Sequence, residues 1–292
     1  MLPPDIQSAM LPCTMCRGQK RAPEGNDGGI KYWWILPFLS FFFSLNNQSF
    51  WIDECCTALC AMQQGMEGCW KKICEIGGSD AQMAFYYYLL FLWHHLTGAE
   101  SEWMLRLFNI FWVFLSSWFF RKEPKALVIL LISPFFVYYS NELRPYMLQI
   151  AASCAVSMLF WQVSRGEPVK FHVFFGSLFF LCLTSLTGVV WALGFAAAFM
   201  VMAFRQFGGR RFRRALLWWI FPFSGLGAYY LYTLFLGARA VSISSSWIVN
   251  ACASMYELSG LAGMGPSRLE LRMCMTPDAL WNMNGLGAGM IS

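Results

Sequence analysis

Long apolar stretches, separated by short polar breaks, dominate this chain and restrict what it can fold into. A helix that crosses a bilayer needs about 20 mainly apolar residues, and seven stretches reach or approach that length: 32–50, 103–120, 126–139, 147–164, 171–184, 188–204 and 215–236. Only 13% of the residues are charged, against roughly 25% in a soluble domain. The sequence therefore predicts an all-α fold, a polytopic transmembrane helix bundle of about seven spans.

The Lys and Arg residues fall in short clusters between the apolar stretches, at 20–31, 121–125, 165–170 and 205–214. Loops rich in Lys and Arg stay on the cytoplasmic side of a membrane. All four clusters obey this rule if the N-terminus is cytoplasmic and seven spans alternate from there. We therefore expect a multi-pass protein of the cell membrane, of the bacterial inner or plasma membrane type. This clustering also argues against a nucleic-acid partner.

The segment 83–96 is apolar but short, and it is rich in Tyr and Trp. If it crossed the membrane, every later basic cluster would lie outside, so we interpret it as an interfacial helix in the first outer loop. Its His94 and His95 are expected to be interfacial residues, because no third metal ligand has a suitable spacing. The breaks that then share the extracytoplasmic face are 51–102, 140–146, 184–187 and 237–292. The acids of the first two breaks can meet there.

Three regions follow from this topology. Residues 1–31 form a cytoplasmic N-terminal segment, 32–236 the transmembrane module, and 237–292 a short extracytoplasmic tail or a truncated one. Residues 1–29 are polar, contain four prolines and have no apolar core. We therefore do not expect a cleaved signal peptide there.

Cysteines gather in the first outer loop, at Cys55, Cys56, Cys60, Cys69 and Cys74. They could form disulfides if the loop faces an oxidising compartment, or they could serve as small apolar packing residues. The same two alternatives, a disulfide or a packing role, apply to Cys252 and Cys274 in the tail. Cys13 and Cys16 form a single CxxC with no second pair and no nearby His, which argues against a zinc site.

Two adjacent acids, Asp53 and Glu54, follow the first apolar stretch in the string FWIDECC. They could simply end a helix and face water. A partly desolvated carboxylate at this position could instead act as a general base toward a hydroxyl or an amine, while its neighbour orients a ligand or a metal.

The string SPFFVYYSNELRPYML, residues 133–148, places Glu142, Arg144 and Tyr146 between two apolar stretches. Charges bracketed so closely by hydrocarbon need a partner or a function. One interpretation is an ion pair between Glu142 and Arg144 that closes the loop. The other is that Arg144 binds an anionic headgroup, since a guanidinium can hold a phosphate bidentately.

Three strings in order resemble motifs of the GT-C superfamily of membrane glycosyltransferases, in particular its bacterial protein O-mannosyltransferase and aminoarabinose transferase branch. They are FWIDE, which ends at Glu54, AFYYYLLFLWHHLTGAESEWMLRLFNIFWVFL at 84–115, and the string at 133–148. The family's RLPS-like motif corresponds to LRLF at 105–108, and its QEARPY-like motif to NELRPY at 141–146. The resemblance covers roughly residues 30 to 236.

The resemblance implies an enzyme that transfers a sugar from a polyprenyl phosphate-linked donor to an acceptor on the extracytoplasmic face, where the acceptor is a glycan, a lipid or a protein. It implies that Asp53 is the base or positions the acceptor, with Glu54 beside it. The residues implied near the donor phosphate are Glu142, Arg144, Tyr146, Lys71 and Lys72. A divalent metal, Mg²⁺ or Mn²⁺, would be held by Asp53 and Glu142.

Two other functions remain open. A transporter or channel would place its ionisable residues near the membrane midplane on broken helices. A non-catalytic, lipid-binding membrane protein would tolerate substitution of Asp53 and Arg144. The acids of this chain fall at the ends of apolar stretches, which favours the enzyme.

Overall fold

The computed structural model describes residues 33–45, 50, 52–78, 80–167, 169–206 and 209–236, and these residues form helices and no strand. The elements are α1 (Ile35–Ser44), α2 (Ile52–Ala61), α3 (Met66–Ile76), the 3₁₀ helix η3 (Asp80–Met83), α4 (Ala84–Thr97), α5 (Glu102–Arg106), α6 (Asn109–Phe119), α7 (Pro124–Ile132), α8 (Pro134–Asn141), α9 (Tyr146–Ser164), α10 (Phe171–Thr184), α11 (Leu186–Gln206) and α12 (Gly209–Phe235). The predicted all-α fold is confirmed for this part of the chain. The predictions for 1–31 and 237–292, with their four cysteines, lie outside the described residues.

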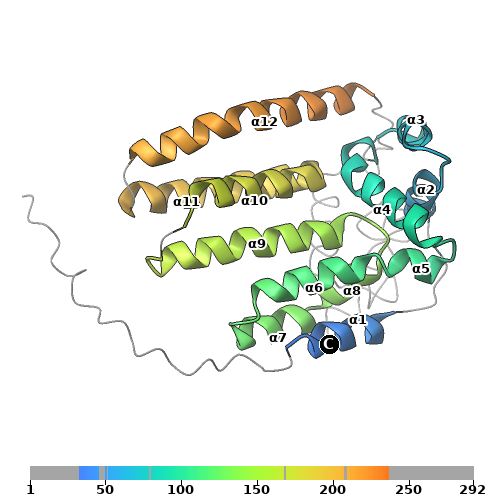
Figure 1. Ribbon diagram of the computed structural model, residues 1–292, viewed down its shortest axis with the longest axis horizontal. Helices are drawn as coiled ribbons and strands as arrows, with labels where there is room; N and C mark the ends of the chain where they lie inside the picture. The colour runs from blue at the N-terminus through green and yellow to red at the C-terminus, as the bar shows by residue number, and fades with distance from the viewer. Residues whose placement is uncertain are drawn as a thin grey trace, which may run out of the picture.

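The longer helices lie roughly parallel in successive layers, from α12 through α10, α11 and α9 to α6 (Figure 1). In this stack α6 packs against α9, α9 against α10, and α10 against α11 and α12. Helix α1 packs against α6, α7 and α8. Helices α2, α3, α4 and α5 gather at one end of the stack (Figure 1).

The polar segments between the long helices lie at the two ends of the stack. At one end, Arg165 Nη1 lies 2.9 Å from Glu123 Oε1, which joins the α9–α10 turn to the α6–α7 turn. At the other end, the hydroxyls of Ser44 and Ser140 lie 3.0 Å apart, which joins the end of α1 to the end of α8. The basic turns at 121–125 and 165–170 therefore lie together, at the end of the stack away from α2 to α5 (Figure 1).

Three of the predicted spans form shorter helices than expected. The stretch 126–139 divides into α7 and α8, because Pro134 has no N–H to donate and Ser133 before it takes an extended backbone (φ −60°, ψ 125°). The stretch 103–120 is divided between α5 and α6. The stretch 32–50 contains only the ten residues of α1, which rise about 15 Å.

Among the described residues, α9 is the one helix that is both long and apolar enough to cross a membrane. Shorter apolar helices are Ile35–Ser44, Phe171–Thr184 and Leu186–Met202. The segment predicted to be interfacial forms α4, which packs against α2 and α3. Its Tyr86 and Tyr87 are fully buried, so one face of α4 belongs to the core.

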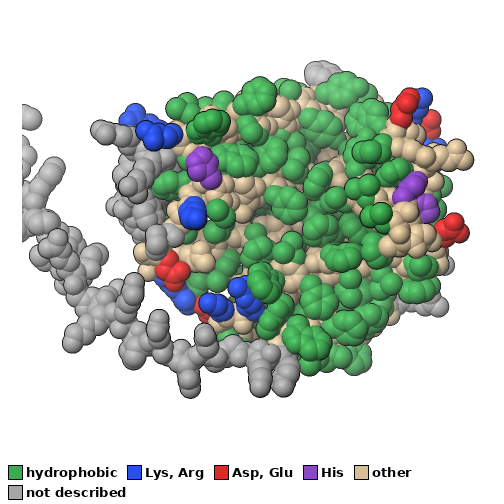
Figure 2. Space-filling view, in the orientation of Figure 1, with side chains coloured by type: hydrophobic (Ala, Val, Ile, Leu, Met, Phe, Trp, Pro, Cys, Tyr) green, Lys and Arg blue, Asp and Glu red, His purple; other side chains and the backbone are tan. Residues whose placement is uncertain are grey.

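Hydrophobic side chains cover the visible face of the molecule between two ends that carry the Lys, Arg, Asp and Glu residues (Figure 2). Phe43 and Phe221 are each 86% exposed, and the next most exposed large hydrophobic side chains are Leu96, Trp218, Ile132, Leu217 and Ile129. Soluble monomers rarely expose a contiguous apolar patch larger than a few hundred Å². A surface of this kind favours contact with lipid or with an apolar partner.

The first turn of α11 requires a glycine at position 188, because it lies close to the last turn of α10. A Cβ atom built on Gly188 would lie 2.3 Å from the carbonyl oxygen of Leu181, far inside van der Waals contact. We therefore expect Gly188→Ala to lower the free energy of unfolding by about 1–3 kcal/mol, the usual cost of overpacking. Thermal unfolding in detergent measures this effect.

Gly194→Ala is the matched control, because a Cβ at Gly194 would meet nothing within 4 Å. It should keep or raise the wild-type melting temperature, because alanine favours a helix more than glycine does. Equal melting temperatures for the two variants would contradict the close approach at Gly188.

Candidate functional site

A buried ion pair joins the start of α2 to the end of α5. Glu54 is 2% exposed and Arg106 is 4% exposed. The Nη2 atom of Arg106 donates to Glu54 Oε2 at 2.9 Å, and Nε donates to Oε1 at 3.4 Å. The backbone N–H of Leu143 also donates to Glu54 Oε1, at 2.7 Å. Both carboxylate oxygens of Glu54 therefore have hydrogen-bond donors, and Glu54 fixes the loop that follows α8.

Asn109, at the start of α6, holds the same loop from the other side. Its side-chain amide donates to the carbonyl oxygens of Ser140, at 3.2 Å, and Glu142, at 2.7 Å. The hydroxyl of Tyr86 on α4 donates to Asn109 Oδ1 at 3.1 Å. Buried backbone outside a helix needs such partners. The loop between α8 and α9 therefore has a fixed path, although it is not helical.

Arg144 in this loop is 3% exposed and lies beside α4 and η3. Its Nη1 atom donates to Asp80 Oδ1 at 2.7 Å, to the Tyr87 hydroxyl at 2.9 Å and to Thr57 Oγ1 at 3.4 Å. The Tyr87 hydroxyl in turn donates to Asp80. The Nε atom of Arg144 is buried and has no hydrogen-bond partner among the described residues.

The charge on Arg144 is stabilised by its neighbours. Burial opposes the charge, but Tyr87, Tyr146, Asp80 and Asp53 favour it, so the pKa of Arg144 lies well above its ordinary value. This interaction places Asp53, which is partly exposed, within electrostatic range of Arg144. A permanent buried cation with one donor atom unused is suited to an anionic ligand.

The structure brings together most of the predicted site residues. Asp53, Arg144 and Tyr146 interact electrostatically, while Glu54 binds the backbone of the loop that carries Arg144. The Glu142 side chain is 5% exposed, and its charge adds to the effect of burial, which raises the pKa of Tyr86 on α4. The ion pairs that Arg144 and Glu54 form are with Asp80 and Arg106.

The two predicted lysines lie on α3, outside the buried cluster. Lys71 is 70% exposed and pairs with Glu67 at 2.8 Å. Lys72 is 35% exposed and pairs with Glu75 at 3.0 Å. Both pairs are local contacts along one helix. Arg144 therefore lies inside the buried cluster, and the two lysines lie outside it.

Sequence reasoning missed six side chains of the network, namely Thr57, Asp80, Tyr86, Tyr87, Arg106 and Asn109. Arg106 belongs to the LRLF string and is a charge inside an apolar stretch, which is a signal for a buried partner. Asp80 stands alone after two glycines and gave no comparable signal. Its role depends on how η3 packs beside α4.

The described residues contain no group of three or more His, Cys, Asp or Glu side chains that could hold a metal ion. His94 Nδ1 lies 2.7 Å from the carbonyl oxygen of Ala99, and His95 Nδ1 lies 3.0 Å from that of Phe91. Mg²⁺ commonly binds through one or two carboxylates together with substrate phosphates. Asp53 and Glu142 are carboxylates of that kind, and a metal held by them stays a prediction.

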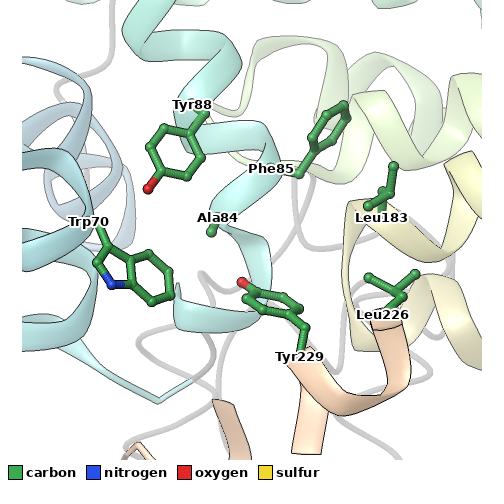
Figure 3. Close-up of a pocket in the computed structure, with 7 residues that line it drawn as sticks. All are labelled: Trp70, Ala84, Phe85, Tyr88, Leu183, Leu226 and Tyr229. Atoms are coloured by element: carbon green, nitrogen blue, oxygen red, sulfur yellow. The ribbon is translucent and has the colours of Figure 1, made fainter. Parts of the chain in front are cut away.

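An apolar cavity of about 460 Å³ lies on another face of α4. Figure 3 shows Trp70 and Tyr88 on one side of it, with Leu183 and Leu226 on the other. Ala84, Phe85 and Tyr229 complete the lining. The Tyr229 hydroxyl donates to the carbonyl oxygen of Ala81 in η3. Helix α4 therefore contributes both to this cavity, through Ala84, Phe85 and Tyr88, and to the surroundings of Arg144, through Tyr87.

Comparisons with known proteins do not identify the site. No protein-family model matches the chain, and neither does any curated protein or solved structure.

Proposed function

We propose that this protein is a membrane glycosyltransferase that moves a sugar from a polyprenyl phosphate-linked donor to an acceptor on the extracytoplasmic face. One observation carries the proposal. The three segments that resemble GT-C motifs, although distant in sequence, meet at Glu54, which binds Arg106 of the second segment and Leu143 of the third. Such convergence is expected if the motifs build one site.

We further propose that the protein is multi-pass, with about seven spans and a cytoplasmic N-terminus. The exposed apolar surface between two charged ends supports this placement (Figure 2). The grouping of the basic turns at the end away from α2 to α5 supports the same topology. Helices shorter than a bilayer would need neighbouring turns, or pairs such as α7 with α8, to complete a span.

In the proposed reaction, the acceptor hydroxyl or amine attacks the anomeric carbon of the donor and loses its proton to the Asp53 carboxylate. The bond between that carbon and the phosphate oxygen breaks, and the lipid phosphate leaves with the bonding electrons. Arg144 stabilises the negative charge on the phosphate. A displacement of this kind inverts the anomeric centre and needs one base.

The remaining residues have supporting roles in this proposal. Glu54 orients the Arg144 loop, since both its oxygens already accept hydrogen bonds. Glu142 and Tyr146 border the phosphate, and Lys71 and Lys72 attract the anionic donor from the surface. A Mg²⁺ or Mn²⁺ ion held by Asp53 and Glu142 would supply further positive charge to the phosphate.

The position of the charged cluster favours an enzyme over a transporter. A transporter would carry its ionisable groups near the middle of broken helices. The pairs of Glu54 with Arg106 and of Asp80 with Arg144 involve α2, α5 and η3, which belong to the end of the stack. This location favours chemistry at one membrane face.

The direct test is a transfer assay with the full chain reconstituted in lipid vesicles. Polyprenyl phosphate carrying different radiolabelled sugars is supplied, and release of polyprenyl phosphate is followed with lipid, glycan and peptide acceptors. We expect turnover with at least one donor. Absence of donor turnover and of donor binding across the panel would reject the proposal, while binding without turnover would favour the non-catalytic lipid-binding alternative.

Arg144→Lys should weaken donor use. Lysine keeps the charge but loses the planar, multi-donor guanidinium, so we expect KM for the donor to rise roughly 10- to 100-fold. Arg165→Lys is the control, because Arg165 pairs with Glu123 at the opposite end of the stack. An unchanged KM in Arg144→Lys would argue against phosphate binding by Arg144.

A further inference from the structure

Arg144, which the proposed function assigns to the donor phosphate, already holds a carboxylate in this structure. Its Nη1 atom donates to Asp80 Oδ1 at 2.7 Å. We infer that Asp80 is a displaceable counter-ion, which pairs with Arg144 in the resting protein and gives it up when a phosphate anion binds. The exchange rests on the anion site of the proposed function and describes how access to that site is controlled.

The charges around Arg144 explain why a phosphate needs this exchange. One guanidinium carries one positive charge, and Asp80 and Asp53 both act on it. Arg144 is 3% exposed, so little water screens the charges beside it. A phosphate that bound next to an unmoved Asp80 would add a further anion to this poorly screened site. Release of Asp80 removes that repulsion.

The two buried ion pairs of the cluster differ in their geometry. Arg106 reaches Glu54 with two nitrogens, and the backbone N–H of Leu143 adds a third bond, so both oxygens of Glu54 are used. Asp80 instead meets Arg144 through one nitrogen, Nη1, at one oxygen, Oδ1. Bidentate pairs are stronger and geometrically more specific than single contacts. The Asp80 pair is therefore the one suited to exchange.

Exposure places Asp80 on the outer side of its pair. The Asp80 side chain is 14% exposed, against 3% for the Arg144 side chain. A carboxylate that turns into water needs no protein partner. The Nε atom of Arg144 is buried and has no hydrogen-bond partner in the described part of the chain. Once Asp80 leaves, a phosphate would therefore meet donors at two nitrogens of one guanidinium.

Two neutral side chains hold Arg144 in place during the exchange. Its Nη1 atom also donates to the Tyr87 hydroxyl at 2.9 Å and to Thr57 Oγ1 at 3.4 Å, and both side chains are fully buried. They carry no charge, so they do not repel a phosphate. The Tyr87 hydroxyl donates to Asp80 as well, which favours the resting pair.

Asp80→Asn tests the exchange, because the amide keeps the shape of the side chain and removes the competing charge. The full chain in detergent is titrated with inorganic phosphate, and its melting temperature is compared with that in KCl of equal ionic strength. A ligand that binds the folded state raises this temperature. We expect the Kd for phosphate to fall at least about 10-fold, the lower end of the roughly 1–3 pKa units by which an adjacent guanidinium stabilises a carboxylate.

The same titration with farnesyl phosphate, a short polyprenyl phosphate, distinguishes a lipid-linked phosphate from a free one. We expect a similar gain for farnesyl phosphate and none for farnesol, which has no charge. A gain with inorganic phosphate alone would support the exchange and assign it to a free phosphate instead of the lipid donor.

Glu100→Gln is the matched control, because Glu100 is exposed at the same end of the stack. It should keep the wild-type Kd. Combining Arg144→Gln with Asp80→Asn removes both charges of the pair and should cancel the gain. Equal or weaker phosphate binding by folded Asp80→Asn would overturn the proposal, and so would a gain that survives Arg144→Gln.

Tyr87→Phe provides a second variant that leaves no buried charge unpaired. It removes the hydroxyl that donates to Asp80, so we expect a smaller fall in the Kd for phosphate. An unchanged or higher Kd would count against the exchange even if Asp80→Asn did not fold. None of these titrations involves a sugar. Tighter phosphate binding without any use of sugar donors would reject the proposed function alone, whereas sugar transfer without tighter binding would reject the exchange alone.

Discussion

Replacing Asp53 with Asn is expected to reduce glycosyl transfer by roughly 10²- to 10⁴-fold, the usual contribution of a general base. The amide cannot accept the acceptor's proton, but it keeps the size of the side chain. Asp53 lies in the first turn of α2 and interacts with Arg144. The assay is release of polyprenyl phosphate from the radiolabelled donor by the reconstituted protein.

Glu123→Gln makes the same chemical change at the opposite end of the stack, where Glu123 pairs with Arg165. It should transfer sugar at the wild-type rate. Both variants should show the same helical content and melting temperature as the wild type. If Asp53→Asn retained full transfer, Asp53 would not be the base. The alternative in which Asp53 and Glu54 only end a helix and face water would then gain support.

Breaking the buried ion pair should have the largest effect on stability. Arg106→Met removes the partner of Glu54 and leaves a carboxylate that is 2% exposed. An uncompensated buried charge costs about 3–5 kcal/mol. We therefore expect a large loss in the free energy of unfolding, measured by denaturant titration in detergent.

The double variant Glu54→Gln with Arg106→Met removes both charges and should recover part of this loss, because the two sites are in direct contact. Lys71→Met is the matched control. It breaks an exposed pair, for which about 0–1 kcal/mol is usual. Equal effects of Arg106→Met and Lys71→Met, or strict additivity in the double variant, would contradict a buried, coupled pair.

The two adjacent acids show why composition alone could not assign roles. Asp53 and Glu54 are neighbours in sequence, but successive residues on a helix point about 100° apart. Glu54 turns toward Arg106 and Leu143, whereas Asp53 stays partly exposed near Arg144. Proposing that Asp53 is the base and Glu54 a positioning residue depends on this difference.

The helices themselves were largely predictable. Apolar stretches and basic breaks predicted an all-α chain, and α9, α10, α11 and α12 lie within a few residues of the stretches expected from the sequence, except that α12 starts earlier. The division of 126–139 follows from Pro134, a local signal that the hydrophobic count overlooked. Helix formation and helix breaking depend on nearby residues, so the sequence by itself determined them.

Only the tertiary structure decided which charges pair. Sequence reasoning considered an ion pair between Glu142 and Arg144, two residues apart. The buried ion pairs of the structure join Glu54 to Arg106, 52 residues away, and Asp80 to Arg144, 64 residues away. A buried charge is stable only beside a partner of opposite sign. Which partner lies within hydrogen-bonding distance is fixed by how α2, η3 and α5 pack around the loop after α8, and no local pattern encodes that.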